Sequence, residues 1–585
     1  MKGLYFAVPA ALRKPLVEQE NAHPEGESEP QAHRQNIEDT DESAALRGRQ
    51  QWVESFRVSG PFNRTVTFKS PAPCSFSEME AFHIERHPPR FLPSFCAILL
   101  AVWTAAAQQG SVSTPTGIAR SLPEEQAPSN RRPLAPNGAP EESNAVPQVR
   151  QIIEDQSDDQ ENPAMFGNHL IAGRFWLSGQ SNLLFQAHTP FHSPYSGPNS
   201  FHGYGESATS IANTLYTGAQ LLRFSELIMS ADLEDGRGLS DALGIAAYPN
   251  ADVIDPDLTN RLYLSRCFFH RTIPVAADRI TQAPNPFFLQ SWIPRQRFEV
   301  IFGKLSLLDY FDVNEVGSDP HLQFTNLAIG NAGTYEYGGD GHGYTIASMI
   351  SYTGPRYGLR FAEALLPKIT NTSDLEYNLR NSREENIEFD YTTYPLRGYI
   401  THVRALTFIN HAGLGNYRQA DNAYLAGVDP TPDISLHRHP GTVKTGFDIN
   451  LEQDLPRNFR AYFRYGWNHG LYESFAFSEM NNTVSFGADI SGNAWRRKYD
   501  RIGSAFVNSG LAYYHREYLA LGGIGFMLGD GKLSYGRESV SETYYTAHVF
   551  GGLYLAAQLS FINNPGFNRA RGPVIVPGLR AHIDF

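Results

Sequence analysis

The chain has 585 residues and a formal net charge of −13, which argues against a nucleic-acid partner because such partners favour a basic face. Its three cysteines are Cys74, Cys96 and Cys267, and only Cys267 remains if the front of the chain is removed, so no disulfide framework is available. The 29 tyrosines and 37 phenylalanines, against 6 tryptophans and 7 methionines, favour strands over helices.

The front of the chain shows the order of a secretory signal peptide. Within residues 79–107, two arginines precede a short apolar run over 91–102, and a run of three alanines follows it. The apolar run is shorter than the roughly 20 residues of a comfortable transmembrane helix. A buried helix is the alternative, but the flanking residues fit export better. Residues 1–78 are then an uncertain extension, and Met79 is an alternative start of translation.

Residues 108–165 are rich in proline, serine, glutamine and asparagine and poor in large apolar residues. Such a composition cannot bury a core, so a flexible spacer is predicted. Throughout the remaining residues, 166–585, short segments in which apolar and polar residues alternate are separated by polar turns.

Sixteen strands are predicted in this second half. Their ranges are 174–187, 208–222, 224–234, 262–272, 296–306, 343–353, 357–366, 386–394, 399–410, 444–454, 458–468, 482–491, 499–511, 540–549, 552–562 and 573–585. Most are longer than the strands of soluble sheets, and they match the roughly 9–11 residues of a tilted membrane strand.

The gaps between these strands alternate between long and short, with one exception at 273–295. Outer-membrane barrels have long loops at one end and short turns at the other, whereas a soluble sandwich has no reason to sort its loops in this way. Strand length, loop alternation and the export signal together predict an all-β, transmembrane antiparallel barrel of the outer-membrane type with about sixteen strands.

Alternation within the strands separates an apolar face from a polar one. In 458–468, for example, Phe463 and Trp467 share one face while Arg460 and Arg464 share the other. In a membrane barrel the apolar face meets lipid and the polar face lines a wet lumen. Two strands are irregular: Glu363 shares a face with apolar neighbours, which indicates a bulge or a different register, and 262–272 mixes both faces.

Several stretches resemble the carbohydrate-selective porins of the OprB family. They are LLFQAHTPFHSPYSGPNSF (183–201), EDGRGLSDALG (234–244), FGKLSLLDYFDVNEVGSDPHLQF (302–324), HREYLALGGIGFMLGDGKLSYG (515–536) and the segment 542–585, which contains NPGFNRARGPV. The resemblance spans 165–585. It implies a sixteen-stranded outer-membrane barrel through which small sugars such as monosaccharides diffuse passively, and it favours a monomer over a trimer.

Strand alternation predicts which charged side chains face the lumen. They are Asp232, Glu234, Arg297, Glu299, Asp448, Glu452, Arg460, Arg464, Asp489, Arg580 and His582. Arginine presents a planar fork of donors and carboxylates accept from hydroxyls, so these groups suit sugars. The alternative for each one is that it solvates the lumen or braces the wall.

The longest gap, 307–342, is the third long loop. The corresponding loop of general porins folds inward, so the resemblance makes this loop the leading constriction. Its candidate sugar-contacting residues are Asp309, Asp312, Asn314, Asp319 and His321, accompanied by tyrosines whose rings could stack on sugars. The alternative is that apolar residues such as Phe311 and Phe324 pack the loop against the wall.

The chain ends in VPGLRAHIDF, residues 576–585, which keeps strict alternation up to Phe585. A strand that closes a barrel in hydrocarbon cannot leave its backbone groups unpaired, so this segment is the predicted seam. A terminal aromatic residue also resembles the signal that the outer-membrane assembly machinery reads.

The predicted function is passive, carbohydrate-selective diffusion of small sugars into the periplasm, with outer-membrane lipid around the barrel. No catalytic residue, metal or cofactor is expected. A general diffusion pore is the alternative within transport. A barrel-based enzyme of the phospholipase type is the alternative from another class, and its serine–histidine pair would have to come from residues such as Ser541 and His548.

Overall fold

The computed structural model describes residues 163–166, 169–252, 261–396 and 398–585. The predicted extension 1–78, the signal peptide 79–107 and the spacer up to residue 162 lie outside the described residues. These assignments remain predictions.

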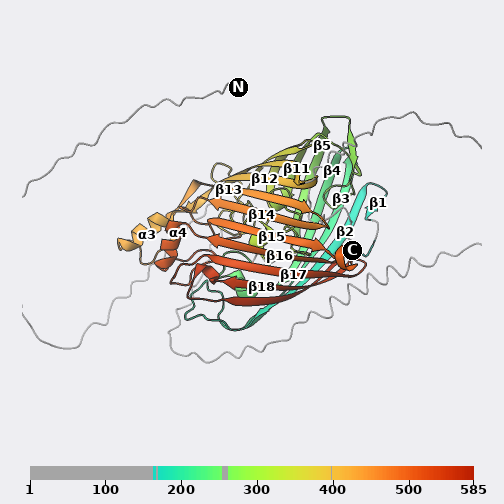
Figure 1. The fold of residues 1–585 in the computed structure, drawn as a ribbon. Helices are drawn as coiled ribbons and strands as arrows, with labels where there is room; N and C mark the ends of the chain where they lie inside the picture. Colours follow the sequence, from blue (N-terminus) through green and yellow to red (C-terminus); the bar gives the residue numbers. More distant parts are fainter. Residues whose placement is uncertain (1–162, 167–168, 253–260, 397) are drawn as a thin grey trace, which may run out of the picture. The chain divides into compact units, whose positions relative to one another are not determined.

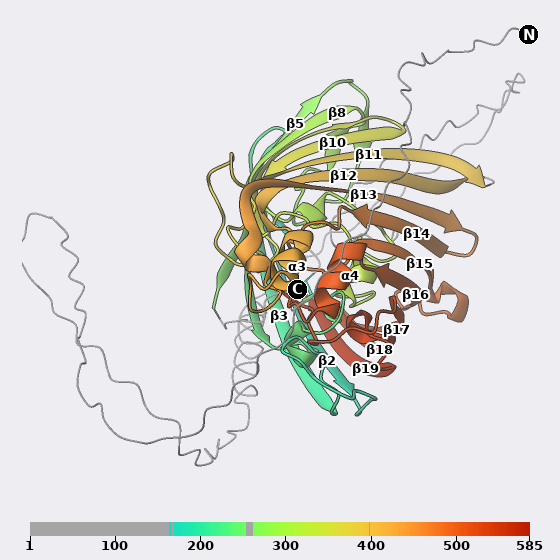
Figure 2. The ribbon, with the colours of Figure 1, turned by 90° about the vertical axis from the view of Figure 1, so that its left-hand side faces the viewer.

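The described residues form a closed antiparallel barrel (Figures 1 and 2). Its strands are β2 (Phe175–His188), β3 (Glu206–Leu222), β4 (Ser225–Gly236), β5 (Tyr263–Pro274), β8 (Arg297–Leu305), β9 (Thr345–Thr353), β10 (Tyr357–Ala364), β11 (Arg383–Leu396), β12 (Tyr399–Gly415), β13 (Arg438–Leu455), β14 (Phe459–Asn468), β15 (Asn482–Ser491), β16 (Arg501–Gly510), β17 (Glu538–Phe550), β18 (Leu553–Asn563) and β19 (Val574–Asp584).

Each strand pairs with the next along the chain, and β19 closes the ring by pairing with β2, with Leu579 opposite Phe185. The predicted sixteen-stranded barrel is therefore confirmed. A short strand, β1 (Leu170–Ile171), adds to the edge of β2. The α-helices of the described residues are α2 (Leu327–Gly330), α3 (Tyr417–Leu425) and α4 (Tyr513–Ala520). Within the described ranges, no helix is long and apolar enough to cross a membrane.

The two ends of the barrel differ in the length of their loops. Helices α3 and α4 belong to long loops at one end, while β1 and the carboxyl terminus lie at the other (Figure 1). The two helices pack together through Tyr417 and His515, whose stacked rings are 4.4 Å apart. The long-loop end is therefore built of packed structure.

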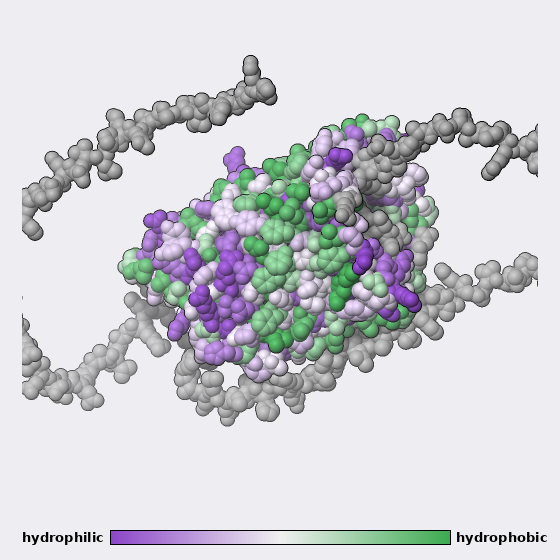
Figure 3. Space-filling view, viewed as in Figure 1, coloured by the Kyte–Doolittle hydropathy of each residue, from purple (hydrophilic) through white to green (hydrophobic). Residues whose placement is uncertain are grey.

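The barrel is apolar outside and charged inside. On β14, Phe463, Tyr465 and Trp467 are each more than a third exposed, whereas Arg460 and Arg464 are at most 3% exposed. Figure 3 shows apolar side chains gathered in a band over the strands, with hydrophilic residues next to it toward the long-loop end. Large exposed apolar areas are unfavourable in water, so this band is suited to lipid.

The two strands with irregular patterns differ in the structure. In β5, Ser265 is an extra residue in the pairing with β4, and this bulge turns both Ser265 and Arg266 inward. The bulge explains the mixed faces of that run. The bulge expected at Glu363 is wrong, because β10 keeps a continuous register with both neighbours. Glu363 faces outward near the end of the strand, where charges on the outer face cost less than at mid-membrane.

The one exception to the loop alternation is a folded insert. Residues 275–296 contain the hairpin of β6 (Arg279–Thr281) and β7 (Trp292–Pro294). Phe287, Phe288 and Leu289 from this insert are almost fully buried, and the backbone N–H of Leu289 donates to Glu226 Oε1 on β4 (3.1 Å). The insert therefore packs against the barrel wall and narrows its short-turn end.

The seam between β19 and β2 is completed by the last residue. The N–H of Phe585 donates to the carbonyl of Gly179 (2.8 Å), and the N–H of Gly179 donates back to Phe585 (2.6 Å). A Cβ atom at position 179 would lie 2.7 Å from the Phe585 ring. Glycine at position 179 therefore leaves room for the terminal ring to lie close against the wall.

We expect Gly179→Val to push the Phe585 ring away and to weaken the seam, because overpacking typically costs about 1–3 kcal/mol. The folded barrel should then unfold at a lower temperature, as measured by heat-modifiable migration on gels. Leu177→Val, at an exposed position on the same strand, is the matched control. Equal unfolding temperatures for both variants would contradict this account of the seam.

Candidate functional site

The loop between β8 and β9, residues 306–344, lies inside the barrel. Leu307 and Phe311 are completely buried, and Phe324 packs edge-on against Tyr544 of β17, with ring centres 4.8 Å apart. The side chain of Asn326 accepts from the N–H of Ala328 and caps the short helix α2. Apolar packing therefore holds part of the loop against the wall. We call this segment the lumen loop.

An ion pair joins the lumen loop to β14. Arg464 Nε lies 2.9 Å from Asp312 Oδ1, and neither side chain is exposed. Arg464 also donates to the carbonyl of Ile329 (2.9 Å), at the end of α2. Asn450 on β13 donates to the same Asp312 oxygen (2.9 Å). One arginine thus holds two distant points of the loop.

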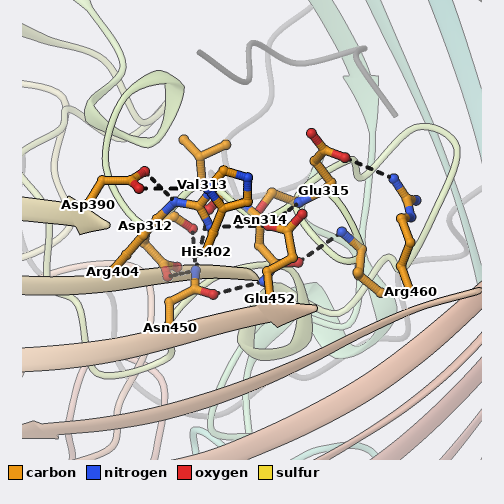
Figure 4. Close-up of polar contacts among 12 residues, drawn as sticks. Asp312, Val313, Asn314, Glu315, Asp390, His402, Arg404, Asn450, Glu452 and Arg460 are labelled. Atoms are coloured by element: carbon orange, nitrogen blue, oxygen red, sulfur yellow. Dashed lines mark hydrogen bonds and ion pairs between the residues drawn. The ribbon is translucent and has the colours of Figure 1, made fainter. Parts of the chain in front are cut away.

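A second cluster lies beside the first (Figure 4). Arg460 pairs with Glu315 of the loop (3.3 Å) and with Asp489 of β15 (2.6 Å). The side chain of Asn314 donates to Asn450 (2.8 Å), and the N–H of Glu315 donates to Glu452 (3.3 Å). Charges of the wall therefore pair with the loop.

The opposite edge of the loop is held by β17 and β19. Glu542 accepts from the backbone N–H groups of Thr325 (2.7 Å) and Asn326 (3.1 Å). Arg580 donates to the carbonyls of Pro320 (2.7 Å) and Gln323 (3.0 Å). Side chains of the wall thus satisfy backbone groups that the inward fold would otherwise leave unpaired.

Burial shifts the pKa of two carboxylates of the lumen loop. It raises the pKa of Asp312 above its usual range, although Arg464 opposes the shift. It also raises the pKa of Glu336, against the attraction of Lys444, whose Nζ lies 2.6 Å from Glu336 Oε1. Both acids therefore depend on their cations to stay charged.

A cavity of about 130 Å³ remains on the other side of the loop. Its wall side consists of residues from β2 to β5, including Gln180, Thr214 and Asp232, and its loop side includes His321 and Tyr344. Many contacts therefore hold the lumen loop to β11–β17 and β19, while a cavity remains between the loop and β2–β5.

The structure separates the predicted lumen residues into three places. In contact with the loop or within its clusters lie Asp448, Glu452, Arg460, Arg464, Asp489 and Arg580. Asp232, Glu234 and the loop residue His321 line the cavity. Glu299 pairs with Arg297 (3.2 Å) and with His270 (3.4 Å), and none of these three is among the described residues that line the cavity.

The other loop residues have structural partners. Asp309 forms a two-pronged pair with Arg266, Asp312 meets Arg464, and the side chain of Asp319 accepts from the N–H groups of His321 and Leu322. The ring of His321 stacks on His582 at 5.4 Å. The carboxylates expected to face sugars are largely occupied in holding the loop.

Several anchoring residues were missed by sequence reasoning. They are Glu384, Glu388, Lys444 and Glu542, which bind the loop at Gly338, Asp312, Glu336 and Thr325. The same alternation that placed Arg464 inside also places these residues inside. The signal was present, but nothing in it distinguishes an anchoring charge from one that faces the passage.

The pair considered for a phospholipase does not form. Ser541 and His548 lie on the same strand, β17, on opposite faces and seven residues apart, which corresponds to roughly 24 Å along a strand. Ser541 is exposed on the outer face, and His548 Nε2 lies 2.8 Å from the carbonyl of Gly551. These two residues cannot act as a nucleophile and its base.

The family model of the carbohydrate-selective porins, the OprB family, matches residues 204–585. The chain belongs to this family. The sequence resemblance is thereby confirmed, and family and fold together indicate a channel of the bacterial outer membrane rather than an enzyme. A search among curated proteins finds no significant match.

A solved porin structure shares the fold. The high-pH structure of Pseudomonas putida OprB is 14% identical, covers 71% of this chain and 95% of its own, and has a TM-score of 0.53. The outer membrane channel DcaP of Acinetobacter baumannii is 9% identical, with 72% and 100% covered and a TM-score of 0.41. At 14% identity, the likeness to the Pseudomonas putida structure shows the architecture of this OprB-family porin and nothing finer.

We expect Arg464→Met to release the lumen loop, because removing one partner of a buried ion pair typically costs about 3–5 kcal/mol. The single-channel conductance of this porin in planar bilayers should rise and fluctuate. Arg380→Met, at an exposed arginine in the loop after β10, is the control. Wild-type conductance and noise in the Arg464 variant would show that the ion pair does not hold the loop.

Proposed function

We propose that this porin lets small carbohydrates diffuse passively from outside the cell into the periplasm, through the passage between the lumen loop and β2–β5. The observation that carries the proposal is the cavity itself, a polar space inside a closed barrel with an apolar outer band. Family membership supports the carbohydrate class.

The lining suits a small, hydrated solute with many hydroxyl groups. Amide, carboxylate, imidazole and phenol groups surround the cavity, represented by Gln180, Glu234, His342 and Tyr337. They supply both donors and acceptors, which a sugar needs as it exchanges bonds with water. The cavity is small, at about 130 Å³, so we expect large solutes to be excluded.

General porins also fold a loop into the lumen, so selectivity depends on the lining of the space that the loop leaves. The loop is held here by charged and backbone contacts from β11, β13, β14, β17 and β19. Solutes would pass on its other side, beside amide, carboxylate and imidazole groups. This lining favours small polar solutes with many hydroxyl groups.

Liposome swelling tests the proposal. Proteoliposomes should swell faster with a monosaccharide than with a trisaccharide, and faster with sugars than with apolar-substituted solutes of equal mass, because the passage is narrow and polar. Protein-free liposomes are the control. Equal swelling rates with solutes of every size and kind would favour a general pore instead.

We also propose that Phe585 serves as a signal for the outer-membrane assembly machinery. Its ring and backbone lie at the seam, where closure must be completed. Removing Phe585 should lower the amount of folded barrel in isolated outer membranes, whereas removing the exposed ring of Tyr513 by Tyr513→Ala should not. Normal insertion without Phe585 would refute this role.

A further inference from the structure

The passage between the lumen loop and β2–β5 is acidic. Asp232 and Glu234 reach it from β4, and Asp252 reaches it from the loop after β4. Among the described residues that line the cavity, Arg266 is the one arginine or lysine. The charge that a solute meets there depends on whether these acids are neutralised.

The side chain of Arg266 forms an ion pair with a residue outside this group of acids. Its guanidinium donates to both carboxylate oxygens of Asp309, at 2.8 and 2.7 Å. The same group lies between the rings of Phe287 (4.8 Å) and Tyr344 (5.0 Å). Its positive charge is therefore cancelled by Asp309 and does not neutralise the three acids that line the cavity.

Two histidines pair with two of these acids. His342 Nδ1 lies 3.5 Å from Glu234, and His321 Nε2 lies 3.2 Å from Asp252. The cavity lining therefore holds three carboxylates and two imidazoles, and Arg580 attracts Asp252 from outside the lining.

Asp232 is the third acid of the cavity lining. The residue is only 3% exposed, and its Oδ2 accepts from the hydroxyl of Tyr344 (2.7 Å). Its Oδ1 accepts no hydrogen bond from any described residue, although buried carboxylate oxygens are normally satisfied. A buried acceptor without a donor, at the wall of a polar cavity, is suited to a donor carried by the solute.

We propose that this passage selects sugars that bear an ammonium group. The ammonium of an amino sugar donates to Asp232 Oδ1 while Glu234 and Asp252 add attraction, whereas the carboxylate of a sugar acid is repelled by all three. This inference rests on the proposed function, since it names the class of carbohydrate that the channel favours.

The test compares three sugars of similar size: glucosamine, glucose and glucuronate, at neutral pH in proteoliposomes. Glucosamine should enter faster than glucuronate, with glucose between them. The full chain in planar bilayers should also prefer potassium over chloride, measured from the reversal potential in a salt gradient. Asp232→Asn should lower the ratio of glucosamine to glucuronate rates about fivefold, the effect of losing one nearby charge in a wet lumen.

Asp235→Asn is the matched control, because Asp235 lies on the same strand and alternates to the opposite face. Glu234→Gln, which also removes a charge from the cavity, should act in the same direction as Asp232→Asn and covers the case in which that variant does not fold. Glucuronate entering as fast as glucosamine, or an unchanged ratio in both cavity variants, would overturn the inference while leaving sugar diffusion intact. Ion conduction without entry of any sugar would overturn the proposed function and the amino-sugar preference with it.

Discussion

The ion pair between Arg464 and Asp312 joins the wall of the barrel to the loop that divides its lumen. Both side chains are excluded from water, so each would be unfavourable without the other. Asn450 and the N–H of Ala332 supply further donors to Asp312, and Arg464 reaches on to Ile329. These added bonds offset the cost of burial and commit the loop to one side of the barrel.

The position of the proposed passage follows from these contacts, because they hold the loop to one side of the barrel. In the half of the barrel formed by β11–β17, arginines on β12 and β14 pair with acids of the loop and of neighbouring strands. These charges therefore stabilise the fold. On the other half, the loop leaves a cavity lined by three acids, and the one arginine of that lining is paired with Asp309. The part of the lumen that holds the loop thus differs in charge from the part through which we propose that solutes pass.

Much of this architecture could be predicted from the sequence, because alternation is a local property. It places Phe463 outside and Arg464 inside without knowledge of any partner, and it locates the closing strand at Phe585. The bulge at Ser265 could not be predicted, since an inserted residue changes the register without changing the composition.

The partners of the loop were beyond sequence reasoning for another reason. Asp309 meets Arg266 and Asp312 meets Arg464 because of the path that the loop takes through the lumen. The alternation of apolar and polar residues along a strand predicts only that a side chain points inward. Whether it meets the loop or the passage depends on contacts between residues far apart in the chain.

The central claim is that solutes pass along β2–β5 and not along the opposite wall. Single-channel recording on a cysteine-free chain tests it with two matched changes, Thr214→Cys at the cavity and Ser485→Cys on β15, where the native serine is 1% exposed. A charged, water-soluble thiol reagent should reduce the current through the Thr214 variant and leave the Ser485 variant unchanged. Block of the Ser485 variant with an unaffected Thr214 variant would contradict the account.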